Sequence, residues 1–398
     1  MNAPVQLTIL MPCLNEAETI AICIEKAKTG IQRAGVPGEI LIADNGSTDG
    51  SQAIADKLGA RVVPVKEKGY GNALRGGIVA ARGRWILMGD ADDSYDFSEA
   101  DRFVKKFQEG YDLVMGCRLP SGGGVIMRGA MPWKNRWIGN PSLSFIGRLF
   151  FKVPAHDFHA GLRAFSKEAL DKLDLQTTGM EFASEMVIKA TLKKLRIAEV
   201  PITLHPDGRT RPPHLKPWRD GWRHLRFMLI YSPRWLFLMP GLALALLGGI
   251  LASALSVNDL QIGNVNLNVG TLVMACMAII VGFQLVTFAF FTKVFAIAEG
   301  LLPEDPKFTR AFKFFTLEKG IVISLLALLA GVIVFLRALW LWKQVHFGAL
   351  NSTEDNLRRL IPAGTLIVLG IQGIFSSFFM SVLGLKTRSR KPPGNEAA

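Results

Sequence analysis

The chain is poor in cysteine, and it lacks the features that mark exported or disulfide-stapled proteins. Its four cysteines among 398 residues have neither paired spacing nor metal-ligand spacing. This pattern excludes a disulfide framework and favours a reducing compartment. The first residues contain no basic region of the kind that opens a signal peptide, and the early apolar run is interrupted at Pro12, Asn15 and Glu16. We therefore expect a buried strand there and not a signal peptide.

Charge is almost absent from four long apolar runs in the second half of the chain. The runs are 235–255, 269–291, 321–342 and 361–383. Each is long enough to cross a hydrocarbon core of about 30 Å, and Arg337 is the one charged residue within them. Transporters place ionisable or unwound polar positions at mid-membrane, whereas Arg337 lies near the end of its run. The sequence therefore predicts four transmembrane helices that serve as an anchor.

Basic residues outnumber acidic ones, giving a formal net charge of +13. Segment 205–234 holds seven basic and two acidic residues, 292–320 holds five basic residues, 384–398 holds four and 257–268 holds none. This asymmetry predicts a multi-pass protein of the cell (inner) membrane, with the soluble part and both termini in the cytoplasm. Segment 343–360, with three basic residues, is the exception. Because membrane topology accounts for the charge, we expect no nucleic acid partner.

The first 200 residues or so alternate apolar runs with helical stretches, without an internal repeat. This order predicts an α/β domain with a mostly parallel sheet and helices on both faces. The expected strands are 5–11, 39–43, 61–65, 84–89 and 112–117. The expected helices are 16–34, 47–58, 72–81 and 98–108. In sheets of this kind, ligands bind at the carboxyl ends of the strands.

Polar clusters fall at these strand ends and predict a site along one edge of the sheet. They are Pro12–Glu16, Asp44–Asp49, Gly69–Gly71, Asp90–Asp93 and Arg118. Asp90 and Asp92 are two residues apart, so an extended chain would point both carboxylates to one side. Mg²⁺ typically takes one or two protein carboxylates and leaves its other positions to water and substrate phosphates. We interpret the pair as a metal and diphosphate site, with an acidic turn as the alternative.

Six motifs occur in the order typical of one enzyme family. They are Pro12-x-x-Asn15-Glu16, Asp44-x-Gly46-Ser47-Thr48-Asp49, Gly69-x-Gly71-x-Ala73-x-Arg75, Asp90-Ala91-Asp92, Gly116-x-Arg118 and Asp157-x-x-x-Gly161-x-Arg163. Over about its first 215 residues the chain resembles glycosyltransferase family 2, and within it the dolichyl- and polyprenyl-phosphate glycosyltransferases. The resemblance implies a GT-A (Rossmann-like) fold, a nucleotide-sugar donor, Mg²⁺ or Mn²⁺, and inverting transfer of one hexose to a polyprenyl phosphate.

Together with the spans, the resemblance predicts four successive parts. They are a glycosyltransferase domain 1–215, an interfacial amphipathic helix 216–234, a transmembrane domain 235–383 and a basic cytoplasmic tail 384–398. In the helix, Trp218, Trp222, Leu225 and Leu229 recur at helical spacing with arginines alongside. Such a helix fits a bilayer surface with anionic headgroups. The alternative is packing against the soluble domain.

The resemblance also assigns residues to the donor side. The implied nucleotide-sugar contacts are Pro12, Leu14, Asn15, Glu16, Asp44, Asp90, Ala91 and Asp92, with Asp90 and Asp92 as the metal ligands. An Asp pair beside a diphosphate needs a cation to tolerate its own charge. Mannose-transferring relatives often carry Gln two positions after the second Asp, where this chain has Ser94. This departure favours a different donor and leaves open whether Ser94 or Asp93 contacts the metal.

The acceptor side should be cationic, because a lipid phosphate must approach a diphosphate and arginine binds phosphate with a planar fork of donors. The candidates are Arg118, Arg136 and one of Arg209 or Arg211. A phosphate monoester is already anionic at neutral pH, so no general base is needed, and positioning with charge neutralisation should dominate. The residues expected to carry catalysis are Asp92, Asp157, Arg118 and Arg136, with Glu185 as a further ordering group. His159, His205 and His214 are interpreted as structural.

Two other functions remain open from the sequence. A processive membrane polysaccharide synthase would share the fold but normally carries Gln-x-x-Arg-Trp, and the nearest matches, ending at Trp137 and Trp235, lack the Gln. A non-catalytic membrane scaffold would be expected to lose the Asp pair. UDP-glucose is the first expectation for the donor, followed by GDP-mannose and UDP-N-acetylglucosamine. The sequence does not fix the donor base and hexose, the polyprenol length, homo-oligomerisation or the downstream pathway.

Overall fold

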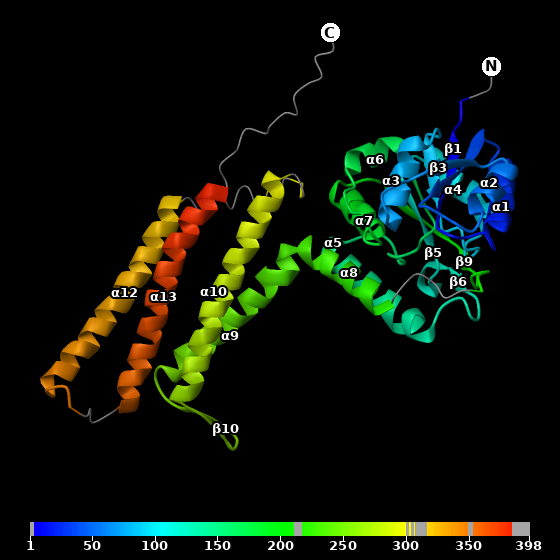
Figure 1. The fold of residues 1–398 in the computed structure, drawn as a ribbon. Coiled ribbons are helices and arrows are strands. Elements are labelled where there is room, and N and C mark those ends of the chain that lie inside the picture. Colours follow the sequence, from blue (N-terminus) through cyan, green and yellow to red (C-terminus); the bar gives the residue numbers. More distant parts are fainter. Residues whose placement is uncertain are drawn as a thin grey trace, which may run out of the picture. The chain divides into compact units, whose positions relative to one another are not determined.

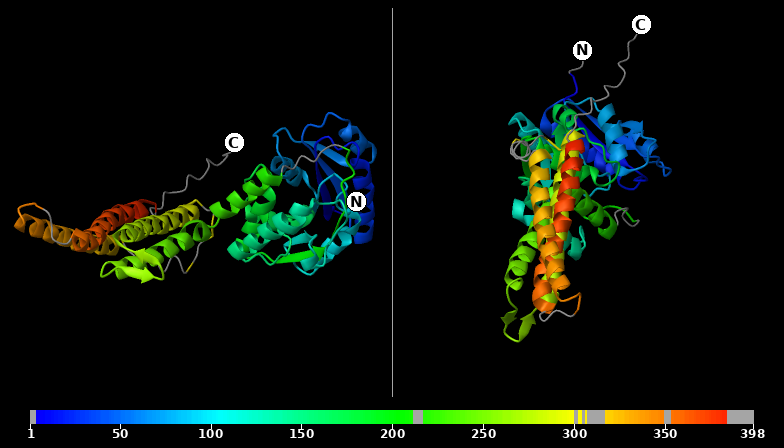
Figure 2. Two further views of the ribbon diagram at one scale, coloured as in Figure 1. Left: turned by 90° about the horizontal axis from the view of Figure 1, so that it is seen from below. Right: turned by 90° about the vertical axis from the view of Figure 1, so that its left-hand side faces the viewer.

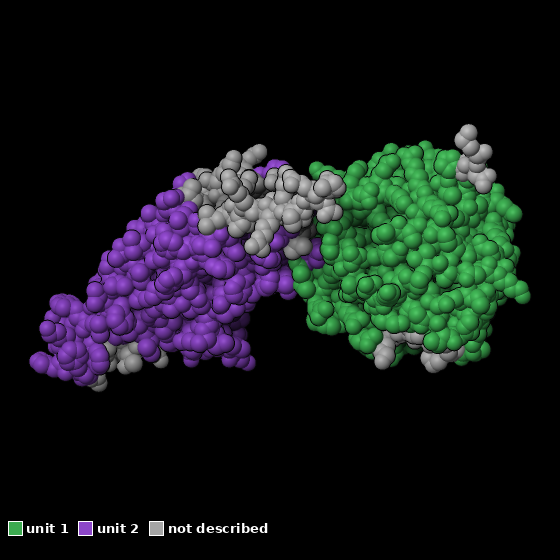
Figure 3. Space-filling model, turned by 45° about the horizontal axis from the view of Figure 1, so that its top comes forward, with its two compact units in different colours: residues 1–230 green, residues 231–398 purple. Residues whose placement is uncertain are grey.

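The computed structural model describes residues 4–210, 217–299, 302–303, 306, 317–348 and 353–383. The chain divides into two compact units, Met1–Ile230 and Tyr231–Ala398, which we call the N-terminal and C-terminal units (Figure 3). The helix of the predicted interfacial segment belongs to the N-terminal unit. The predicted tail 384–398 lies outside the described residues.

A seven-stranded sheet forms the centre of the N-terminal unit, in the order β3-β2-β1-β4-β7-β5-β8. Its strands are β1 Leu7–Cys13, β2 Gly38–Asp44, β3 Arg61–Pro64, β4 Trp85–Met88, β5 Leu113–Cys117, β7 Arg163–Ser166 and β8 Ile197–Pro201. All neighbours pair in parallel except β7, which is antiparallel to β4 and β5. The five predicted strands and the mostly parallel sheet are confirmed. The sequence analysis did not predict β7 or β8.

Helices cover both faces of this sheet (Figure 1). They are α1 Ile20–Ala34, α2 Ser51–Lys57, α3 Tyr70–Ala80, α4 Ala100–Gln108, α5 Asn140–Phe151, α6 Lys167–Leu173, α7 Phe182–Leu192 and α8 Pro217–Ile230. Because successive strand residues point to opposite faces, Ile9 of β1 packs into the cluster that includes α1 and α4. Its neighbour Leu10 packs against Gly77 of α3. Short elements are η1 Phe97–Glu99, η2 Pro120–Gly122, η3 Asn135–Gly139, β6 Val125–Ile126 and β9 Thr203–Leu204.

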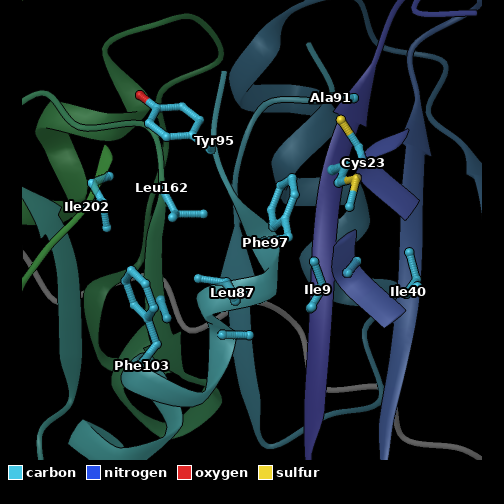
Figure 4. Packing of buried hydrophobic residues seen from close by; sticks show 14 of the residues in the cluster. Ile9, Cys23, Ile40, Leu87, Ala91, Tyr95, Phe97, Phe103, Leu162 and Ile202 are labelled. Carbon is cyan, nitrogen blue, oxygen red and sulfur yellow. The ribbon is translucent and has the colours of Figure 1, made fainter. Parts of the chain in front are cut away.

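Helix α1 shows how local sequence sets these elements. Its buried positions Ile20, Cys23, Ile24 and Ala27 follow the three- and four-residue spacing of one helical face. The helix ends at Gly35, whose φ of 63° is left-handed and suits glycine. The buried side places α1 against the apolar core, where residues of β1, β4, η1 and α4 meet (Figure 4). The helix begins four residues later than predicted, because Glu16 belongs to the loop after β1.

The C-terminal unit contains four helices long and apolar enough to cross a membrane, which confirms the four predicted spans among the described residues. The spans are Arg234–Leu255, Val269–Ala298, Leu317–Gln344 and Asn356–Leu383. The elements are η4 Arg234–Leu238, α9 Met239–Leu255, β10 Leu260–Ile262, β11 Val265–Leu267, α10 Val269–Ala298, α12 Leu317–Gln344 and α13 Thr353–Leu383. Figure 2 shows α12 and α13 side by side. Glycines permit the close approach: a Cβ on Gly331 of α12 would lie 2.7 Å from the Ala363 carbonyl of α13.

An ion pair bears on the exception to the charge rule in segment 343–360. Arg358 is buried and donates to the Asp259 carboxylate and to the Leu255 carbonyl. The pair joins the start of α13 to the connector between α9 and α10. Arg358, one of the three basic residues of 343–360, is therefore paired with an acidic residue, and the start of α13 lies at the same end of the C-terminal unit as the connector between α9 and α10.

Candidate functional site

The loops after β1 and β2 are tied together by side chains of the sequence motifs. The Asn15 amide donates to the Ser47 hydroxyl at 2.9 Å, and the Asn15 side-chain oxygen accepts from the Thr48 amide at 2.8 Å. The Glu16 amide donates to the Ser51 hydroxyl at 2.9 Å. Asn15 has a left-handed φ of 60°, which Asn tolerates better than most residues. Asn15 therefore fixes the loop that carries Glu16.

Asp44 is buried at the end of β2 and organises the turn that follows it. Its carboxylate accepts from the Gly46 amide at 3.0 Å and from Gln52 Nε2 at 2.6 Å. Pro12 and Leu14, at the end of β1, are half-buried. The structure thus brings these predicted donor residues to one edge of the sheet, and their contacts with base and ribose stay a prediction.

Asp90 and Asp92 follow β4, which already ends at Met88, and residues 91–94 form a bend. The prediction of an extended chain at this pair is therefore wrong, because the bend breaks the two-residue alternation. The two groups still interact. Burial, followed by the Asp92 charge, raises the pKa of Asp90 to about 7, and a hydrogen bond with the Tyr70 side chain opposes the rise. Carboxylates that repel each other in this way suit a bound cation.

Asp92 is oriented by Ser94, whose hydroxyl and amide donate to Asp92 Oδ1 at 2.6 and 3.1 Å. Asp93 instead forms an ion pair with Lys26 of α1 at 2.6 Å. Ser94 therefore lies beside the carboxylate pair, while Asp93 is engaged elsewhere. Within the described part of the chain, no group of three or more His, Cys, Asp or Glu could hold a metal. A pair of carboxylates fits Mg²⁺ that shares a substrate diphosphate.

Arg118 and Asp157 form a buried ion pair. Arg118 follows β5 and donates from Nε and Nη2 to the two Asp157 oxygens at 2.7 and 2.9 Å, and its amide adds a bond of 3.0 Å. Asp157 is 0% and Arg118 is 7% exposed. Burial alone would raise the pKa of Asp157, but the Arg118 charge and hydrogen bonds outweigh it and lower that pKa. Asp157 therefore positions the Arg118 guanidinium.

Tyr95 and Gly161 connect this ion pair to the carboxylates. The Gly161 amide donates to Tyr95 Oη at 2.8 Å, and the Tyr95 side chain lies near enough to Arg118 to affect its pKa. A Cβ on Gly161 would lie 2.9 Å from Tyr95 Oη and 3.0 Å from Asp90 Oδ2. Position 161 therefore has no room for a side chain. Neither Tyr95 nor Tyr70, which is hydrogen-bonded to Asp90, was predicted from the sequence, although Tyr70 lies within the Gly69–Gly71 cluster.

The remaining arginines occupy different places. Arg136 lies on η3, with its guanidinium 5.4 Å from the Trp137 ring centroid. Its buried Nε has no hydrogen-bond partner among the described residues. Arg209 contacts Asp92 at 2.8 Å and Glu16 at 3.3 Å, on the donor side of the site. Arg211 lies outside the described residues.

Two buried ionic residues hold the surrounding backbone. Arg163, on β7, donates to the carbonyls of Ala160 and Ala183. Glu185 pairs with Lys189 at 2.7 Å and accepts from backbone amides before α7. Arg163 appeared in a sequence motif without an assigned role. Glu185 orders the loop before α7.

The histidines lie in different surroundings, and the His159 ring lies beside that of His224, with centroids 4.6 Å apart. Both ring nitrogens of His159 are buried without a hydrogen-bond partner there, and burial, followed by the nearby His224, lowers its pKa well below the usual value. The His205 amide donates to the Ser94 carbonyl at 3.0 Å. His214 lies outside the described residues. The structural interpretation of His159 agrees with a neutral, packed imidazole.

Comparison with known proteins defines the class of protein to which this fold and site belong. Residues 8–174 match glycosyl transferase family 2, and residues 290–384 match the glycosyltransferase family 2 C-terminal transmembrane region. The low-salt glycan biosynthesis hexosyltransferase Agl6 of Haloferax volcanii is 36% identical over 380 residues, which cover 95% of this chain and 89% of the relative. The chain belongs to glycosyltransferase family 2. It is a membrane-embedded glycosyltransferase with an N-terminal GT-A domain.

Two further similarities cover the N-terminal half. A dolichyl-phosphate hexose transferase of Haloferax volcanii is 29% identical over 197 residues, which cover 49% of this chain and 81% of the relative. A glucosyl-3-phosphoglycerate synthase from Mycobacterium tuberculosis was solved with Mn²⁺, uridine diphosphate and glucosyl-3-phosphoglycerate. The match covers 57% of this chain and 78% of the synthase chain at 22% identity, with a TM-score of 0.44.

Proposed function

We propose that this protein transfers one hexose from a nucleotide sugar to a polyprenyl phosphate at the cytoplasmic face of the membrane. The observation that carries the proposal is a set of exposed aromatic side chains on the N-terminal unit, with Arg136, which is suited to a phosphate, beside one of them. We call Trp133, Trp137, Phe145, Trp218 and Trp222 the aromatic surface. These side chains come from α8 and from the region of η3 and α5, and α5 and α8 are in contact.

Helix α8 is oriented opposite to an ordinary surface helix. Its buried residues Asp220, His224 and Met228 face the rest of the N-terminal unit, and His224 Nδ1 is 2.8 Å from the Ser184 hydroxyl. Trp218 and Trp222 are 89% and 57% exposed. A helix that meets water normally buries its apolar stripe. Outward tryptophans with basic neighbours instead suit the headgroup region of a bilayer.

Arg136 lies within the same surface, between the exposed Trp133 and Trp137. Its guanidinium carries a positive charge that suits an anion, and its Nε has no hydrogen-bond partner among the described residues. A lipid phosphate presented by the bilayer would bring such an anion with its apolar chain beside the tryptophans. Arg118, held in place by Asp157, is the second proposed acceptor contact.

Asp90 and Asp92 fit a divalent cation, and we assign Mg²⁺ or Mn²⁺ to them. When bound, the ion would supply charge stabilisation for the departing nucleoside diphosphate. Arg118 and Arg136 would align the acceptor phosphate oxygen, which needs no proton removed, for attack on the anomeric carbon with inversion. UDP-glucose is the proposed donor, with GDP-mannose as the second choice. The hexosyltransferase and dolichyl-phosphate names of the relatives support this chemistry.

The test is transfer from radiolabelled UDP-glucose, GDP-mannose and UDP-N-acetylglucosamine by full-length protein in vesicles that contain polyprenyl phosphate. We expect label in solvent-extractable lipid and none with Asp92→Asn. Label in polymer would replace the proposal with a polysaccharide synthase. If the folded protein transfers no sugar from any of the three donors in the presence of Mg²⁺ or Mn²⁺, the proposal as stated is refuted. The protein would then use a different donor or act as a scaffold.

A further inference from the structure

A short segment before α8 lies against the donor side of the site. We call residues 205–210 the donor strap. The Gly208 amide donates to the Asp92 carbonyl at 3.0 Å. The Thr210 amide and hydroxyl both donate to the Glu18 carboxylate at 2.8 Å. The donor strap therefore bridges the loop after β1 and the loop after β4.

Arg209 is the centre of this bridge. Its guanidinium lies 2.8 Å from Asp92, 3.3 Å from Glu16 and 2.9 Å from Asp207, and its side chain is nine-tenths buried. An arginine keeps its charge at all accessible pH values. It can therefore give up these carboxylates only by moving, and not by losing a proton.

The oxygens of Asp92 are already divided between two partners. Oδ1 accepts from both the hydroxyl and the amide of Ser94, and Oδ2 accepts from Arg209 Nη2. A cation that binds Asp92 thus meets the Arg209 charge at Oδ2 or displaces the Ser94 hydrogen bonds at Oδ1. Two positive groups at one carboxylate oxygen repel each other. Cation binding and the Arg209 contact therefore compete.

We propose that Arg209 is an internal counter-cation that exchanges its Asp92 contact for the donor diphosphate when the divalent ion binds. The inference rests on the proposed metal and donor site. A nucleoside diphosphate offers the displaced guanidinium new anionic oxygens, with which arginine forms strong paired hydrogen bonds. The exchange makes the protein a poor binder of the ion alone and a good binder of the ion together with the nucleotide. Such coupling between two ligands is reciprocal.

The experiment is a titration of full-length protein in detergent micelles with Mn²⁺, followed by the electron paramagnetic resonance of the free ion, without and with UDP. The variants are Arg209→Ala, Arg209→Lys and, as a matched loss of charge, Arg82→Ala. Arg82 is exposed, and its amide donates to Glu39 near the start of β2. The donor residues lie at the other end of this strand, so the Arg82 variant removes a positive charge away from the site. Asp92→Asn serves as the control for the site itself.

We expect Arg209→Ala to bind Mn²⁺ alone about tenfold more tightly than wild type, which corresponds to about 1.4 kcal/mol. Arg209→Lys should lie between them, and Arg82→Ala should change affinity less than twofold, roughly, because exposed charges are screened. UDP should strengthen Mn²⁺ binding by a larger factor in wild type than in Arg209→Ala. Equal or weaker Mn²⁺ binding by Arg209→Ala would overturn the inference. Unchanged Mn²⁺ binding in Asp92→Asn would instead refute the metal site, and the inference with it.

Discussion

Asp157→Asn should lower the free energy of unfolding of the N-terminal unit by about 3–5 kcal/mol, the range for breaking a buried ion pair from one side. The cost is high because Arg118, 7% exposed, would keep its charge and lose a carboxylate that accepts three of its hydrogen bonds. Arg118→Gln should cost a similar amount. The double variant removes both charges, so we expect a loss about 2–3 kcal/mol smaller than the sum of the two.

The assay is a urea titration of full-length protein in micelles with pulse proteolysis, scored on fragments of the N-terminal unit at pH 7. Because the pKa of Asp157 is lowered in the folded state, the stabilisation is fully present above the ordinary Asp pKa and is lost only as the pH falls through the folded value. The exposed pair of Arg84 and Glu168, 3.4 Å apart, is the matched control. Glu168→Gln should cost less than about 1 kcal/mol. Losses for Arg118 and Asp157 that add within about 0.5 kcal/mol would refute the coupling.

Four further outcomes follow from the site. Asp92→Asn should abolish transfer while the protein still folds and inserts; near-normal turnover would show that the pair is only a turn. Because the pKa of Asp90 is raised to about 7, Mn²⁺ affinity should rise with pH by up to about tenfold per unit below that value and level off above it, as calorimetry can measure. Gly161→Ala, whose Cβ would lie 3.0 Å from Asp90, should cost about 1–3 kcal/mol of stability and most of the transfer activity; unchanged turnover would exclude the crowding. Arg136→Ala should lower kcat/KM for the lipid by an amount that corresponds to roughly 2–5 kcal/mol of lost transition-state stabilisation if the contact is desolvated, and Arg136→Lys should recover part of this loss. Equal weakening of donor binding would show that Arg136 contacts the diphosphate instead.

Local sequence patterns were sufficient to predict the architecture of this protein. Span length and lack of charge are properties of single segments, so the four membrane-length helices could be predicted without knowing their neighbours. The alternation of apolar runs and helices likewise predicted a mostly parallel sheet. Parallel strands end at one edge of a sheet. The order of the motifs along the chain was therefore enough to predict that Glu16, Asp44, Asp90 and Arg118 lie at the same edge.

Periodicity was sufficient for only part of α8. It predicted one outward apolar face made of Trp218, Trp222, Leu225 and Leu229. The two tryptophans are exposed, whereas the two leucines are half-buried. It did not predict that Asp220 and His224 would be buried. His224, for example, meets Ser184, which is 40 residues away in the sequence.

Tertiary structure decided the partners within the site. The spacing between positions 118 and 157 does not show that the two side chains form an ion pair. They meet because the antiparallel strand β7, inserted between β4 and β5, places the 157–161 loop against Arg118, Tyr95 and Asp90. The contact of Arg209 with Asp92 likewise joins residues 117 positions apart. A sequence pattern shows which side chains a segment contains. The direction and neighbours of a buried charge depend instead on strand pairing and on the free-energy cost of burying that charge without a partner.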